Sequence, residues 1–156
     1  VIVRLKSGHD DAVPSANTLQ LSNLAALTAL TGDNVYQTRA EALYDAFQGD
    51  ISRSPAGHCG LLAQSFDLDG LLQIVLVAHG GERQGLLNAM HALSLPGGVE
   101  VTAGAAVLTN SLLAEKFSAS TTPAAFVCVG PVCSEPVIEP DALKQRLSEA
   151  RSSCLA

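Results

Sequence analysis

The run LLQIVLVA, at residues 71–78, decides the fold class of this chain. It is a continuous apolar stretch rich in Ile, Leu and Val, which is typical of a strand that is buried on both faces of a sheet. Two glycines end the run, residues 82–93 have the apolar spacing of a helix, and VEVT at 99–102 begins a second strand. A strand–helix–strand order favours parallel pairing through a right-handed crossover. The sequence therefore predicts a small α/β domain with a mainly parallel sheet over residues 70–156.

Two further elements are expected in this domain, a strand at residues 124–129 and a final helix at 141–152. The pair Gly130-Pro131 follows the strand and forms turns readily, because Gly can supply the positive φ of a type II′ hairpin. A two-residue loop would place Cys128 directly opposite Cys133, with Cα atoms roughly 4.5 Å apart in a non-hydrogen-bonded pair. That distance lies within the reach of a disulfide. The domain is therefore expected to end in a hairpin that brings two cysteines together.

Residues 1–69 read as a helical segment that precedes the α/β domain. Three helices are expected, at 15–31, at 36–51 and from Pro55 toward Phe66. Ser15 is a suitable N-cap of the first helix, and Gly32 fits the position just after its end. The four-residue link to the second helix predicts an antiparallel helical hairpin. The sequence DLDG at 67–70 is the expected boundary between the two parts.

An apolar stripe follows the second predicted helix, where Tyr36, Leu43, Phe47 and Ile51 recur at helical spacing. A helical hairpin with one further helix buries little apolar surface on its own. We therefore expect this stripe to be buried against the α/β domain or against a second copy of the chain in a homodimer.

Composition limits the function classes that suit this chain. Its 156 residues (16.1 kDa) suit one domain or two small units that share a core, and 47% hydrophobic against 15% charged residues argues against disorder. The net charge is −6, without the basic cluster that nucleic-acid binding needs. The longest apolar run is too short to span a bilayer, and no signal-peptide pattern is visible. We expect no nucleic-acid partner, no membrane association and a cytoplasmic location.

Two sequence blocks carry a family resemblance: VRLKSGHDDAVPSAN at residues 3–17 and AAFVCVGPVCSEPV at 124–137. LTALTGDNVYQTRAEALYDAF, at 27–47, follows the first block, and LQIVLVAHGG, at 72–81, precedes the second. In this order the blocks resemble the C-terminal region of the spermatogenesis-associated type of thioredoxin-domain-containing protein family. The resemblance implies the closing helices of an (α/α) toroid followed by an appended small α/β domain. The thioredoxin-like domain that gives the family its name is not part of the matching region.

The cysteine pair is the first candidate site, since family members resemble this chain in carrying Cys128 and Cys133 at this spacing. The pair does not form a C-x-x-C motif, and no helix N-terminus follows it to lower a thiol pKa. A structural thiol pair or buried disulfide, a redox-responsive pair and a metal site are the three interpretations. Zinc would need two more ligands, and Cys59 and Cys154 do not have the paired spacing of zinc ligands.

The loop GHDDAVPSAN at residues 8–17 is the second candidate. The family pattern here is similar to D-G-A-E-P-S-G-N-S, and this chain keeps Asp10, Ser15 and Asn17 but has Val13 in place of the acid. Because toroids of this type bind sugars in a central cavity, the resemblance implies a polar site at the toroid rim. The missing acid argues against catalysis by a pair of carboxylates. The alternative is a turn that leads into the first helix, ordered by Asp10 and capped by Ser15.

The expected function is a non-catalytic structural and docking role within a multidomain protein. The expected partners are the upstream domains of the same polypeptide, with a homodimer through exposed helical faces as the further expected assembly. No catalytic residue, cofactor or metal ligand is assigned. Two alternatives stay open: a contribution to a sugar-directed isomerase- or epimerase-like site of the toroid, and a thiol redox accessory that acts through Cys128 and Cys133.

Overall fold

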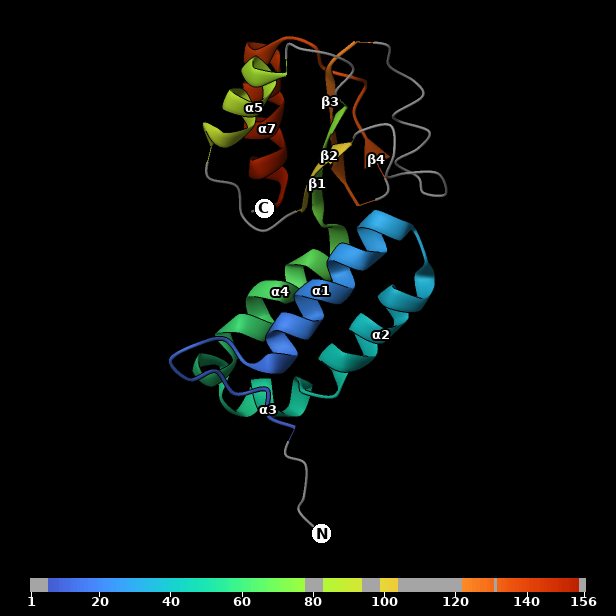
Figure 1. Cartoon of the computed structure of the whole chain (residues 1–156). Coiled ribbons are helices and arrows are strands. Elements are labelled where there is room, and N and C mark those ends of the chain that lie inside the picture. Colours follow the sequence, from blue (N-terminus) through green and yellow to red (C-terminus); the bar gives the residue numbers. More distant parts are fainter. Residues whose placement is uncertain (1–5, 78–82, 94–98, 104–121, 131, 155–156) are drawn as a thin grey trace. The chain divides into compact units, whose positions relative to one another are not determined.

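The computed structural model describes residues 6–77, 83–93, 99–103, 122–130 and 132–154 (Figure 1). The chain divides into two compact units. The helical unit holds Val1–Thr28 and Asp33–Asp69, and the α/β unit holds Ala29–Gly32 and Gly70–Ala156. The architecture is thus mixed. No helix within the described residues combines the length and the hydropathy that crossing a membrane requires.

Within its described residues, the helical unit is built from four α-helices and one 3-10 turn: α1 (Ala16–Thr31, whose end belongs to the α/β unit), α2 (Asn34–Asp45), α3 (Gln48–Arg53), the turn η1 (Pro55–His58) and α4 (Cys59–Gly70). Local chemistry explains where the first two helices begin and end. The hydroxyl of Ser15 accepts a hydrogen bond from the N–H of Thr18 (3.1 Å), as expected of an N-cap. Gly32 adopts a positive φ of 70°, and the carboxylate of Asp33 accepts from the N–H of Val35 (2.9 Å).

The second predicted helix is interrupted, which corrects the prediction of one helix over residues 36–51. The N–H of Phe47 bonds to the carbonyl of Tyr44 (3.0 Å), which tightens the end of α2, and α3 begins at the next residue. The ring of Phe47 is buried with Leu21 and Leu61 in one apolar cluster. The DLDG sequence at 67–70 forms the last turn of α4.

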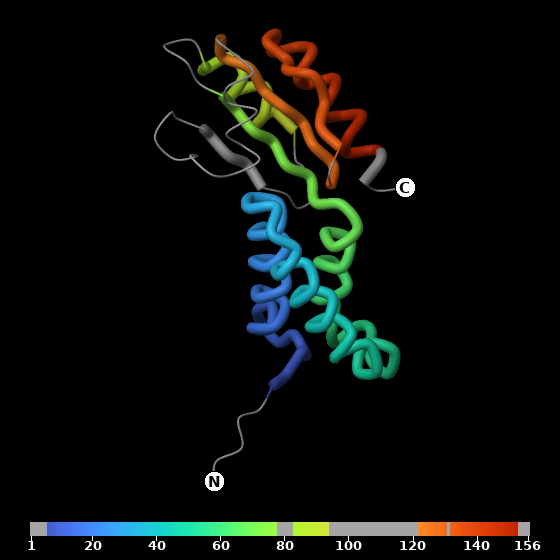
Figure 2. Tube along the Cα trace, turned by 90° about the vertical axis from the view of Figure 1, so that its right-hand side faces the viewer, coloured from blue at the N-terminus to red at the C-terminus, as the bar shows by residue number. Residues whose placement is uncertain are grey.

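The apolar stripe of the second predicted helix is buried inside the helical unit itself. Phe47 and Ile51 are buried, and Tyr36 and Leu43 are partly buried, in a cluster formed with α1 and α4. Figure 2 shows α1, α2 and α4 side by side, as in Figure 1. The expectation that the stripe needs the α/β domain or a second copy to cover it was therefore wrong, because the turn at Phe47 folds the stripe onto neighbouring helices.

The α/β unit contains a four-stranded sheet of order β2-β1-β3-β4. The elements among its described residues are β1 (Leu72–Val77), α5 (Gln84–His91), β2 (Val99–Ala103), β3 (Ala124–Val129), β4 (Val132–Cys133) and α7 (Pro140–Cys154). The predicted parallel pairing of β1 with β2 is confirmed. The prediction of a mainly parallel sheet was wrong, because β1 pairs with β3, and β3 with β4, in antiparallel fashion. The crossover rule applies to a strand–helix–strand unit, and it does not determine the direction of β3.

Both faces of β1 are buried, as the continuous apolar run predicts. Leu72, Ile74 and Leu76 belong to a cluster with residues of α5 and α7, which lie on the same side of the sheet (Figure 1). Val75 and Val77 point to the opposite face, because side chains alternate along a strand. The sheet thus has one face covered by two helices and a second face that contains Cys128.

Candidate functional site

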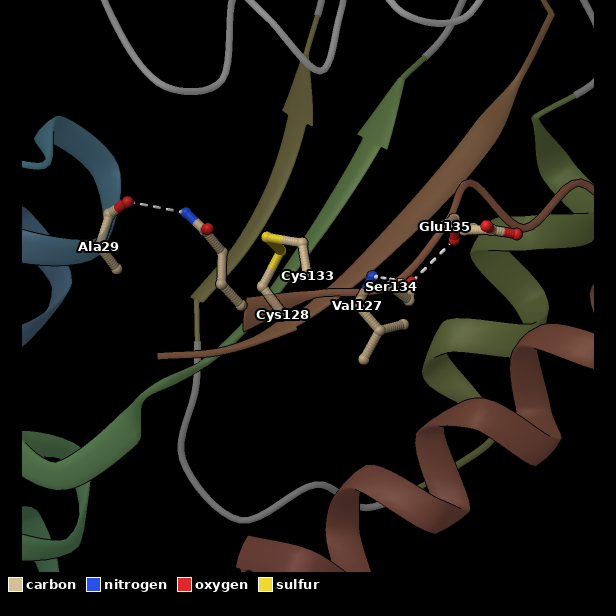
Figure 3. Close-up of a disulfide and its surroundings, with 7 residues drawn as sticks. Ala29, Val127, Cys128, Cys133, Ser134 and Glu135 are labelled. Atoms are coloured by element: carbon tan, nitrogen blue, oxygen red, sulfur yellow. Dashed lines mark hydrogen bonds between the residues drawn. A yellow bond between two sulfur atoms is a disulfide. The ribbon is translucent and has the colours of Figure 1, made fainter. Parts of the chain in front are cut away.

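The two cysteines of the terminal hairpin form a disulfide (Figure 3). Cys128 of β3 lies directly opposite Cys133 of β4, and their Cα atoms are 3.9 Å apart. Gly130 has the expected positive φ of 56°, whereas Pro131 lies outside the described residues. The predicted cross-strand pairing is confirmed, because equal numbers of residues on the two arms keep both side chains on one face of the hairpin.

The two halves of the disulfide lie in different surroundings. Cys128 has no exposed surface and packs with Val75, Val77 and Phe126 on the second face of the sheet. Cys133 is exposed at the edge of the sheet. Cys133 is thus the exposed half of the disulfide and Cys128 the buried half.

A side-chain hydrogen bond lies beside the disulfide. Gln73 of β1 is the strand partner of Cys128 on its other side, and its side-chain amide donates to the carbonyl of Ala29 (3.1 Å; Figure 3). This hydrogen bond ties the last turn of α1, which belongs to the α/β unit, to the sheet face that holds Cys128. No group of three or more His, Cys, Asp or Glu side chains in the described part of the chain is arranged to hold a metal ion.

The carboxylate of Asp10 joins three segments of the helical unit. Its Oδ1 accepts from the N–H of Ser15 (2.8 Å) and from the hydroxyl of Thr18 (3.3 Å), both at the start of α1. Its Oδ2 accepts from the N–H of Gly60 (2.6 Å) in the first turn of α4. The first N–H groups of a helix have no partner within the helix, and the helix dipole favours an anion there. Asp10 therefore stabilises the starts of two helices at once.

The hydrogen bonds determine the charge state of Asp10. Burial desolvates the carboxylate, which by itself would raise its pKa. The N–H groups of Gly60 and Ser15, the hydroxyl of Thr18 and the charge of His58 outweigh this effect, so that the pKa is lowered below its ordinary value of 3.8. The group is therefore an anion at neutral pH, and both of its oxygens accept hydrogen bonds from the chain itself.

The three residues of the predicted rim site are only partly brought together. Asp10 and Ser15 share a hydrogen bond, and the hydroxyl of Ser15 also lies 3.0 Å from that of Thr18. Asn17 is not part of this network; its amide donates to the carbonyl of Ser7 (2.7 Å). Asp10 and Ser15 thus form a structural cap, and Asn17 fastens the preceding loop.

Sequence reasoning missed Gly60 and His58 as neighbours of this loop. Gly60 lies fifty residues from Asp10, and a Cβ there would come within 2.7 Å of Thr18. The buried His58 has its Nδ1 2.8 Å from the carbonyl of Ser54, and the ring of His9 packs edge-on against it with centroids 5.5 Å apart. The sequence offers no local signal for the contacts of Asp10 with Gly60 and of His9 with His58, because both join the N-terminal loop to the region where α4 begins.

Comparisons with known proteins find two similar relatives. The chain is 28% identical over 158 residues to spermatogenesis-associated protein 20 of Homo sapiens and 26% identical over 155 residues to the protein of the same name of Rattus norvegicus. These alignments cover 93% and 94% of this chain but only 20% of each relative, so the chain spans about one fifth of their length. No family model and no solved structure matches the chain. Nearly the whole chain is therefore similar to one part of spermatogenesis-associated protein 20, which confirms the resemblance carried by its two sequence blocks.

Proposed function

We propose that this chain is a non-catalytic structural and docking portion of a longer, multidomain polypeptide. In this proposal its helices are the closing helices of an (α/α) toroid, and the α/β unit is a small domain appended to them. The partners are then helices of the same polypeptide that lie outside this chain. The relatives support this arrangement, because four fifths of their length lies outside the aligned region.

The apolar residues that α1 and α4 expose carry the proposal. α1 contains no charged residue over its sixteen positions. On the side away from its buried residues it exposes Leu19 (57%) and Leu27 (36%), and α4 exposes Phe66 (71%). A helix that faces water normally has polar and charged residues on its outer side. These exposed apolar residues are therefore suited to packing against further helices, and covering the exposed surface that each retains would stabilise the assembly by about 0.5–2 kcal/mol.

The geometry of Asp10 supports a non-catalytic role. A sugar-directed isomerase- or epimerase-like site would need this carboxylate to reach a substrate. Its two oxygens instead accept three hydrogen bonds from Ser15, Thr18 and Gly60. Releasing the carboxylate would leave the starts of α1 and α4 without these partners. The group is thus suited to holding the helical unit together.

The test measures whether Phe66 is covered in the complete polypeptide that the gene encodes. A Phe66→Cys variant, with Cys59→Ser to remove the nearby thiol, is labelled with a maleimide in the isolated chain and in the complete polypeptide, and the rate is read at that peptide by mass spectrometry. Val35→Cys is the matched control, because Val35 is exposed on α2. We expect at least tenfold slower labelling at position 66 in the complete polypeptide, with little change at position 35.

Three results would contradict the proposal. The first is equal labelling at position 66 in both forms. The second is slow labelling at position 66 already in the isolated chain, which would assign these residues to a homodimer. The third is a complete polypeptide that consists of this chain alone, because the proposal requires further helices outside it.

A further inference from the structure

The strand that follows the turn covers the outer edge of β3. The N–H of Ser134 donates to the carbonyl of Val127 (2.8 Å), and Ala125 and Val137 exchange two hydrogen bonds of 2.8 Å each. Between these contacts the register slips by one residue, since Val127 faces Ser134 but Ala125 faces Val137. The hydroxyl of Ser134 accepts from the N–H of Val127 (3.1 Å). The segment 132–137 therefore pairs with the outer edge of β3, and we call this segment the edge cover.

The edge cover holds to β3 through few backbone contacts. β4 is only two residues long, and Pro136 has no N–H to donate to the sheet. A two-stranded ribbon of this length is at best marginally stable by itself. The Cys128–Cys133 disulfide joins the two strands covalently at the start of the edge cover. The bond is thus placed where breaking it would weaken the pairing of the edge cover with β3.

We propose that the Cys128–Cys133 disulfide is a thiol–disulfide exchange site, attacked at the sulfur of Cys133 by an external dithiol, and that its reduction uncovers the edge of β3. Attack on a disulfide proceeds in line with the S–S bond, and access is one of the factors that determine which sulfur is attacked. Cys133 is exposed, whereas Cys128 is fully buried among Val75, Val77 and Phe126. In this proposal the dithiol therefore approaches along the bond from the side of the exposed residue Cys133.

The exchange balances in two steps. A thiolate of the dithiol attacks Sγ of Cys133, a new S–S bond forms, and Sγ of Cys128 leaves and takes up a proton. The second thiol of the reductant loses its proton and attacks the mixed disulfide, which expels Cys133. Two electrons pass from the dithiol to the cystine, so the dithiol leaves as a disulfide and the protein carries two thiols.

Reduction changes what the sheet presents to its surroundings. With the bond broken, the N–H and C=O groups of Ala125 and Val127 lose their partners whenever the edge cover opens. An uncovered strand edge is a template for pairing with another extended segment. The disulfide thereby controls access to the β3 edge.

The first experiment determines which sulfur reacts. Single variants Cys128→Ser and Cys133→Ser are made in a background that carries Cys59→Ser and Cys154→Ser, and each is incubated with glutathione disulfide. We expect the Cys128→Ser chain, which keeps the exposed Cys133, to gain one glutathione at least ten times faster than the matched Cys133→Ser chain. Equal rates, or a faster reaction of Cys128, would overturn the proposal.

The second experiment needs no variant. Amide hydrogen exchange of the wild-type chain is followed by NMR before and after reduction with dithiothreitol. We expect the amides of Ala125, Ser134 and Val137 to exchange at least fivefold faster after reduction, while that of Val75 in β1 changes less than twofold. Unchanged exchange of the three edge amides would show that the bond does not hold the edge cover, and an equal acceleration at Val75 would show general loosening of the sheet; either result would refute the proposal.

Discussion

Replacing Asp10 with Asn should destabilise the helical unit, although it changes only one atom of the side chain. In the native chain, Oδ1 accepts from Ser15 and Thr18, and Oδ2 accepts from Gly60. An amide keeps one acceptor oxygen and places an NH₂ group opposite the other donor. Whichever way the amide turns, one backbone N–H loses its acceptor. An unsatisfied donor costs about 1–3 kcal/mol, and because Asp10 is only half-buried we expect a loss of about 1–2 kcal/mol at neutral pH.

The pH dependence follows from the lowered pKa of Asp10. A carboxyl whose pKa is lower in the folded state than its ordinary value of 3.8 stabilises the fold at pH values above 3.8. This stabilisation decreases as the pH falls from about 5, and it is lost once the pH passes below the pKa of the folded state. Asn does not titrate, so the difference in free energy of unfolding between the two proteins should shrink in acid.

Urea unfolding at pH 7 and at several values down to pH 3, followed by far-UV circular dichroism, measures both effects. Asp11→Asn is the matched control, because the neighbouring carboxylate takes no part in the hydrogen-bond network that joins α1 and α4. We expect this control to stay within about 0.5 kcal/mol of the wild type. An Asp10→Asn protein as stable as the control at pH 7, or a difference that grows toward pH 3, would refute the role assigned to Asp10.

Three further substitutions test the remaining parts of the fold by equilibrium or thermal unfolding. The double variant Cys128→Ala/Cys133→Ala should lose about 2 kcal/mol under non-reducing conditions, because the disulfide closes a short loop with a sequence separation of 5; a double variant as stable as the wild type would contradict this. Gly8→Ala should cost about 1–3 kcal/mol, since a Cβ there would lie 2.7 Å from a ring carbon of Phe47, and a neutral effect would show that the loop moves freely. Leu147→Ala should cost about 2–5 kcal/mol because its side chain is fully buried beneath the sheet, and a loss below 1 kcal/mol would place it outside the core.

The disulfide hairpin shows how much a short sequence can predict. The pair Gly130-Pro131 specifies a two-residue loop, and the loop length alone places Cys128 opposite Cys133, as the structure confirms. The cap at Ser15 was equally predictable, because a side chain that bonds to an N–H three residues away acts within its own segment. These features depend on neighbours in the sequence and could therefore be predicted.

The break between α2 and α3, in contrast, could not be predicted from neighbouring residues in the sequence. Apolar spacing continues through Phe47 to Ile51, and the sequence has no proline or glycine at the break itself. The structure turns at Ala46 and Phe47, and this places the ring of Phe47 in the cluster of the helical unit. Packing overrides a periodic pattern when a bend buries more apolar surface than a straight helix would.

The sequence by itself determined the approximate positions of most elements, the start of α1, the buried character of β1 and the register of the hairpin. Only the tertiary structure decided the direction of β3 beside β1, the place where the stripe of Phe47 and Ile51 is buried, and the contact of Asp10 with Gly60. The physical reason is the range of the interactions. Caps, turns and strand alternation follow from dihedral preferences and hydrogen bonds over a few residues, whereas pairings across fifty residues depend on how the whole chain closes on its core.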